Sequence, residues 1–188
     1  MMVTIMPPLA VEILSNSSSF SVDVKHRLHH QKQNCHHFGV STRIEYLHDY
    51  HVDINAFVAD ILVTHLSTQM FYRAFYSILD TMKSSGINMT SFLNNLELIV
   101  SDFCLTQRKG IEKAIRMFSI EHEIYDIDIE ALFSGCMFHF GQSALRKKRN
   151  VRDQNLFSQF IHTIKQSTEK EEMEKTFHNL KHSVNGAK

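Results

Sequence analysis

Proline and glycine are scarce in this chain of 188 residues. Only two prolines occur, Pro7 and Pro8, and only six glycines. A protein built from many β-strands needs turn residues roughly every 8–12 positions. After Pro8 no proline ring removes a backbone donor from a helix. The scarcity of both residue types therefore favours a helical body.

Net charge is also lacking, because 20 basic and 20 acidic side chains balance. Such a chain has no overall field that draws it onto nucleic acid or an anionic membrane. No apolar run approaches the roughly 18 residues of a membrane-spanning helix. The N-terminal stretch lacks the basic region of a secretory signal. We therefore expect neither nucleic acid nor a membrane as a partner, and a cytoplasmic or nuclear location.

Motifs of catalysis and of structural zinc are missing as well. The sequence contains no glycine-rich phosphate loop, no C-x-x-C, no H-E-x-x-H and no nucleophile elbow. Its three cysteines, Cys35, Cys104 and Cys136, lack the spacing of a disulfide framework and indicate reduced thiols. These absences favour a protein that is not an enzyme.

Histidine, in contrast, is abundant in residues 25–51. This segment holds seven of the 13 histidines, namely His26, His29, His30, His36, His37, His48 and His51. One interpretation is a zinc site in which His48 and His51 lie on one helical turn. The other is a polar, partly solvated segment with a biased composition. Because no second ligand pair accompanies the first, the polar segment is the favoured interpretation.

Apolar spacing predicts helices in the middle of the chain. In residues 53–82, large apolar side chains recur at steps of three and four, as on the buried face of one long helix or of two helices in sequence with a bend near Ser67-Thr68. Ser84-Ser85-Gly86 is typical of a helix end. Asn88 or Thr90 can begin the next helix, whose apolar stripe continues to Phe103.

The stretch 111–144 predicts two more helices, joined by an acidic segment. The first stripe consists of Ile111, Ala114, Ile115, Phe118 and His122. Asp126 or Asp128 can cap the second helix. The second stripe consists of Leu132, Phe133, Cys136, Phe140 and Ala144.

Basic residues cluster at 146–152, in the stretch RKKRNVR. The cluster could contact phosphates or serve nuclear localisation. Alternatively, it is a solvated loop whose cations compensate the dipole of a helix C-terminus. No aromatic residues are interleaved with it, which favours the loop. The spacing in residues 153–164 and 168–180 predicts two final helices, the last of them highly charged.

Together these patterns predict an all-α protein with a single globular domain of about six or seven helices. Residues 1–40 would form a disordered or loosely packed, His-rich arm. Residues 41–167 would form the helical domain, and residues 168–188 a charged C-terminal helix and tail.

His122 needs an explanation, because it falls in line with core residues. It is either a buried or half-buried histidine whose ring nitrogens find a backbone carbonyl and a water, or the axial ligand of a haem. A neutral imidazole on an apolar helix face is what a haem iron requires, since apolar walls also hold the porphyrin.

The order of the predicted helices resembles a globin. The segment DINAFVADILVTHLSTQMFYRAF is similar to a second globin helix that runs toward the third, and FSIEHEIYDIDIEALFSGCMFHF to a proximal helix with the helix after it. The resemblance covers at most Asp53 to Lys165. It implies a haem cofactor with His122 as the proximal iron ligand. The other haem contacts that it implies are Phe75, Phe118 and, on the distal side, Leu93 or Asn94.

Three functions compete on this sequence. The first is a non-catalytic helical binding or regulatory module that acts through protein–protein contacts, for which Phe- and Met-rich stripes and a charged terminal helix are suitable. The second is a haem-binding globin relative that binds or senses a ligand. The third is a nucleic-acid binder that uses the basic cluster. The first ranks ahead because it needs no special geometry.

Overall fold

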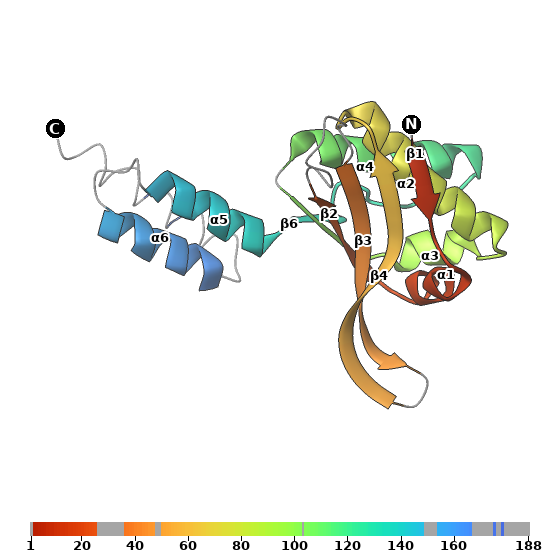
Figure 1. The fold of residues 1–188 in the computed structure, drawn as a ribbon, viewed down its shortest axis with the longest axis horizontal. Helices are drawn as coiled ribbons and strands as arrows, with labels where there is room; N and C mark the ends of the chain where they lie inside the picture. Colours follow the sequence, from red (N-terminus) through yellow and green to blue (C-terminus); the bar gives the residue numbers. More distant parts are fainter. Residues whose placement is uncertain are drawn as a thin grey trace. The chain divides into compact units, whose positions relative to one another are not determined.

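The computed structural model describes residues 2–25, 36–47, 50–102, 104–148 and 154–166, together with Lys175 and His178. The chain divides into two units, Met1–Gly135 and Cys136–Lys188, and each is described by itself. The first unit contains a six-stranded mixed sheet (Figure 1). The protein is therefore α/β, and the prediction of an all-α, globin-like domain is wrong.

The sheet of the first unit has the strand order β1-β4-β3-β2-β5-β6. The strands are β1 (Met2–Ile5), β2 (Ser19–Lys25), β3 (His36–Leu47), β4 (Tyr50–Val63), β5 (Leu98–Ser101) and β6 (Phe133–Gly135). Neighbours among β1, β4, β3 and β2 pair antiparallel, whereas β2, β5 and β6 run parallel to one another. The carboxyl ends of β2, β5 and β6 consequently lie at the same end of the sheet.

One face of this sheet, called the inner face, carries the core. Four helices contribute to that core: α1 (Pro8–Ser15), α2 (Thr68–Ser84), α3 (Met89–Asn95) and α4 (Leu105–Glu121). Phe38 of β3 contacts Phe71 of α2, and Phe20 of β2 stacks on Phe75, with ring centroids 5.6 Å apart in both pairs. In Figure 1, α4 passes behind β3 and β4, and α3 lies beside them near α1.

The predicted boundaries of α2 and α3 are partly confirmed. The Ser67 hydroxyl accepts a hydrogen bond from the Met70 backbone N–H at the start of α2. The helix ends where predicted, and Gly86 follows it with a φ of 85°, a value that glycine adopts without strain. Asn88 caps α3 by accepting from the Ser91 N–H.

The predicted helix from residue 53 is wrong in its first part, because residues 50–63 form β4. The register against β3 shifts between Val40 and Ser41, which leaves Val58 as an extra residue, a β-bulge. Phe57 is consequently 69% exposed on the outer face of the sheet, while Ile61 is fully buried on the inner face. The bulge breaks the two-residue alternation of apolar and polar residues by which a strand is recognised. The sequence therefore did not indicate a strand here.

The N-terminal arm was predicted to be disordered or loosely packed, but residues 2–25 form β1, α1 and β2. Pro8 is the first residue of α1, where its fixed φ suits a helix and its missing N–H has no intrahelical acceptor. Phe20 and Val22 of β2 are buried in the core. Residues 16–18, all polar, form the short connection between α1 and β2.

The predicted helices over residues 92–103 and 126–144 also need correction. Residues 98–101 form β5 and residues 133–135 form β6. Short apolar runs fit a buried strand and a buried helix equally well by local pattern. Parallel pairing decides the outcome here: Ser19 lies opposite Leu98, and Ile99 lies opposite Phe133. These partners are too far apart in sequence for a local pattern to reveal.

The helix predicted at residue 111 is confirmed, although α4 begins earlier, at Leu105. Its stripe residues Ile111, Ala114, Ile115 and Phe118 are all buried. The helix packs tightly on α2 at Gly110. A Cβ atom on Gly110 would lie 2.4 Å from the Phe71 Cβ and 2.8 Å from the Thr68 carbonyl oxygen.

A hydrogen bond between α2 and α4 produces a pH dependence that can be measured. The Tyr76 hydroxyl donates to the Glu121 carboxylate. This bond, followed by burial and by the charge of Glu121, raises the pKa of Tyr76 from 10.0 to about 12. Between these two pH values the unfolded chain loses the phenol proton and the folded chain keeps it. The stability that Tyr76 contributes is thus complete below pH 10 and is lost as the pH rises toward 12.

Ultraviolet titration of tyrosinate formation checks this expectation. One tyrosine of the wild-type protein should ionise near pH 12, and that step should be absent from Tyr76→Phe. Glu121→Gln should move the step back toward pH 10, because the acceptor loses its charge. A late step that persists in Tyr76→Phe would belong to another tyrosine.

The second unit contains α5 (Met137–Lys148) and α6 (Gln154–Gln166). Arg146, Lys147 and Lys148 lie in the last turn of α5, where cations favour the helix dipole, and not in the loop that was predicted for them; positions 149–152 lie outside the described residues. The predicted helix at 168–180 also lies outside them, apart from Lys175 and His178. Across the described parts of both units, none of the helices combines the length and the apolar character needed to cross a membrane.

Candidate ligand pocket at the carboxyl ends of the parallel strands

The side chains predicted to contact haem are structural parts of the first unit. Phe75, Leu93 and Phe118 are buried in its single core. Phe75 stacks on Phe20, and Phe118 packs edge-on against Tyr76. Asn94, the other distal candidate, is exposed at the end of α3. The helical frame that the globin resemblance required is replaced by the sheet.

His122 is the residue that ends α4, rather than a member of its buried stripe. Its ring packs edge-on against Phe118, with centroids 4.3 Å apart. The Lys83 ammonium donates to its Nδ1 at 3.0 Å. His122 is thus half-buried, and its ring nitrogens face a lysine ammonium rather than the backbone carbonyl and water of the alternative that the sequence left open.

The zinc site that would use His48 and His51 is not found among the described residues. His48 lies outside them, and His51 belongs to β4 rather than to a helical turn. His37 of β3 instead pairs with Asp60 of β4, with Nε2 and Oδ1 2.5 Å apart. This pair lies across neighbouring strands, where contacts between polar side chains help to hold a sheet together.

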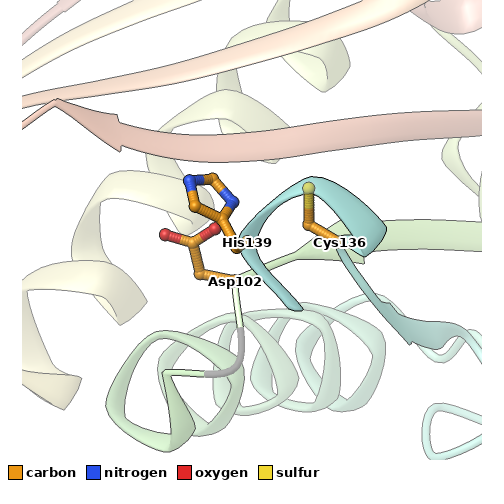
Figure 2. A group of neighbouring side chains, drawn as sticks. All are labelled: Asp102, Cys136 and His139. Carbon is orange, nitrogen blue, oxygen red and sulfur yellow. The ribbon is translucent and has the colours of Figure 1, made fainter. Parts of the chain in front are cut away.

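Figure 2 shows three further residues of metal-binding type. Asp102 follows β5, while Cys136 and His139 come from the start of α5, three positions apart. Asp102 belongs to the first unit and the other two residues to the second. Each is therefore considered only within its own unit, and we build no metal site from the three.

A stronger candidate site lies within the first unit, where the parallel strands end. Strand β5 leads through residues 102–104 into α4, and α4 leads back to β6, which is a crossover between parallel strands. In open α/β sheets, ligands bind outside the carboxyl ends of such strands. The N-terminus of α4 also lacks both a side-chain cap and an acidic residue in its first turn. The first N–H groups of a helix have no acceptor within the helix, so they can donate to a group outside it.

Two pockets flank the N-terminus of α4, and both are lined by Asp102 and Cys104. The larger has a volume of about 230 Å³ and reaches Arg108 and the strand β6. The smaller, called the Gln107 pocket, has a volume of about 120 Å³. Its apolar walls are Val24, Leu66 and Phe71, and its polar lining is Asp102, Cys104, Thr106 and Gln107.

Gln107 lines the smaller of the two pockets but not the larger. Its side chain is 1% exposed, and within the described part of the chain neither its amide nitrogen nor its amide oxygen has a hydrogen-bond partner. Buried polar groups are nearly always paired, so an orphaned pair of them calls for an explanation. The tight contact of Gly110 with α2 holds this part of α4 against Phe71, and therefore keeps Gln107 at the wall of the pocket.

Sequence reasoning missed Gln107 because nothing local marks it. A glutamine near the start of a helix is an ordinary surface residue, and it belongs to no motif. Its burial follows from the docking of α4 on α2 and on the ends of β2 and β5. Extending the predicted helix backward from Ile111 would have placed Gln107 one turn earlier on the same side as the buried stripe.

Comparisons with protein-family models, with curated proteins and with solved structures find no match to this chain. A function has to rest on the side chains of the site itself.

Proposed function

We propose that the first unit is a binding module that holds a small polar ligand in the Gln107 pocket. The observation that carries this proposal is the buried amide of Gln107, whose nitrogen and oxygen both lack a hydrogen-bond partner among the residues that the structure describes. Because both atoms have almost no exposed surface, a ligand that presents one acceptor and one donor would pair with them once the side chain turns its amide into the pocket.

The composition of the pocket supports the proposal. Ligand sites are typically apolar cavities with a few polar groups that orient the ligand. Here Val24, Leu66 and Phe71 supply the apolar walls, and Asp102 and Gln107 supply polar groups of different kinds. Asp102 offers an acceptor, while Gln107 offers a donor and an acceptor.

The position in the fold supports it as well. The pocket lies where β2 and β5 end and where α4 begins. Loops at this end of a parallel sheet can vary in shape while the strands beneath them stay fixed. The protein partner and the haem suggested by the sequence are different proposals. The partner stays a prediction, and haem loses the helical frame on which it depended.

Gln107→Met tests the proposal. Methionine is close to glutamine in size but has no strongly polar group. In the ligand-free protein we expect the substitution to raise the free energy of unfolding by about 1–3 kcal/mol, because it removes buried polar groups without partners. Binding of small amides, followed by NMR at residues 104–107, should be lost at the same time. Gain of stability with loss of binding is typical of a functional residue.

Gln69→Met is the matched control, since Gln69 is exposed at the start of α2. Gln69→Met should leave the binding of small amides unchanged and should shift the free energy of unfolding by less than about 0.5 kcal/mol. Destabilisation by Gln107→Met would mean that internal water pairs the amide and that Gln107 is structural. That result would contradict the proposal.

A further inference from the structure

The two helices of the second unit leave an apolar groove between them. Helices α5 and α6 pack side by side (Figure 1). The groove has a volume of about 230 Å³ and is recessed between the two helices. Its lining comes from both of them and includes Ala144, Leu145 and Lys148 of α5 and Phe157, Ile161 and His162 of α6.

The apolar side chains around this groove are only partly covered. On α6 the large apolar side chains are all half-buried, and none of them is fully buried: Leu156, Phe157, Phe160, Ile161 and Ile164. On α5, Leu145 lines the groove and is 68% exposed. The apolar stripes of α2 and α4 in the first unit are buried, in contrast. An apolar helix face has to pack on another element, so a third element that covers this groove gains free energy from the burial.

The charge of the helix pair indicates which element fits. Helices α5 and α6 contain no Asp or Glu, although acidic and basic residues are equally frequent in the whole chain. Arg146, Lys147 and Lys148 lie in the last turn of α5, and Lys148 also lines the groove. Binding surfaces of opposite charge attract each other, and like charges across an interface are costly. The pair therefore favours an acidic partner.

From the groove and its charge we infer that α5 and α6 bind an acidic amphipathic helix of another protein. Such a helix places apolar side chains, spaced by three and four residues, into the groove. Its acidic flank pairs with Arg146, Lys147 and Lys148. Three packed helices then enclose the apolar residues that two helices leave partly exposed. An anionic membrane would match the charge, but its flat surface does not fit a recess. This site is separate from the Gln107 pocket.

The experiment measures how two labelled helical peptides bind to the full chain, by fluorescence anisotropy. Both peptides carry the same leucine stripe, and their polar faces carry either glutamate or lysine. We expect the glutamate peptide to bind about tenfold or more tightly, because the lysine peptide meets like charges. Its affinity should fall as salt is added, since salt screens exposed charges.

Variants of the groove test where the peptide binds. Leu145→Gln should lower the affinity for the glutamate peptide about fivefold or more, because it removes an apolar side chain that the peptide covers. Lys148→Gln should reduce the preference for glutamate over lysine. Leu9→Gln is the matched control, since Leu9 is 59% exposed on α1 in the first unit. It should leave the affinity for both peptides unchanged.

Equal affinity for the two peptides, or an affinity that Leu145→Gln leaves unchanged, would overturn the inference. Three other results would overturn it by assigning the groove to a different occupant. Binding to phosphatidylserine vesicles without peptide binding would assign it to a membrane surface. Peptide binding only after removal of residues 168–188 would assign it to the acidic segment of the chain itself. A dimer in sedimentation that Leu145→Gln abolishes would assign it to a second copy.

Discussion

Gly110→Ala should destabilise the first unit by about 1–3 kcal/mol or more, the range for overpacking of a tight contact. The new methyl group would lie 2.4 Å from the Phe71 Cβ and 2.8 Å from the Thr68 carbonyl oxygen, where no carbon atom fits. Because one neighbour is backbone and the other is the root of a side chain, neither can rotate away. Helix α4 has to move off α2, which opens the core between them. Urea denaturation followed by circular dichroism measures the loss.

Two control variants separate this steric effect from others. Lys109→Ala changes an exposed neighbour on the same helix and should stay within about 0.5 kcal/mol of the wild type. Gly86→Ala places a side chain at a φ of 85° with nothing within 4 Å, so its cost of about 1 kcal/mol is conformational rather than steric. If Gly110→Ala unfolds at the urea concentration of Lys109→Ala, the close packing of α4 on α2 is wrong.

Phe75→Ala should cost about 3–5 kcal/mol, the typical loss for deleting a buried aromatic ring. Phe75 is 2% exposed in the centre of the core and stacks on Phe20. Its removal leaves a cavity between β2 and α2 that the surrounding side chains can only partly fill. We expect the midpoint of thermal unfolding to fall steeply, and differential scanning calorimetry would record it.

Phe57→Ala is the matched control, because it deletes the same ring from a site that is 69% exposed on the outer face. Its effect should remain within about 0.5 kcal/mol. The comparison also bears on the haem prediction. A phenylalanine that lines an empty haem pocket would tolerate truncation far better than one that fills a core. Similar stabilities of Phe75→Ala and Phe57→Ala would contradict the core described above.

Helices with a complete local signature could be predicted from the sequence. The stripe of α2 from Met70 to Met82 is buried as the spacing indicated, and the stop at Gly86 follows. The same holds for α6, where apolar spacing identified the helix. In each case the pattern lies within one element, so propensity, amphipathicity and end signals agree.

Elements that depend on distant partners could not be predicted. In β4, the extra residue Val58 changes the face of Phe57 and imitates a helical spacing. The strands β5 and β6 are short apolar runs whose conformation is decided by pairing with β2 and with each other. The candidate site could not be predicted for the same reason, because Gln107 becomes buried only when α4 packs against the rest of the first unit.

The parallel pairing of β2 with β5 also has a kinetic consequence. The hairpins of β2, β3 and β4 close short loops, whereas the register of Ser19 with Leu98 closes a loop that includes most of the first unit. Contacts between residues distant in sequence require the closure of a long loop, which costs entropy before the contact energy can compensate for it. Such contacts therefore form late. Val24, Phe71 and Gln107 meet only when β5 and α4 have joined the sheet. We therefore expect the pocket to be among the last features to assemble, and a ligand to slow unfolding more than it accelerates folding.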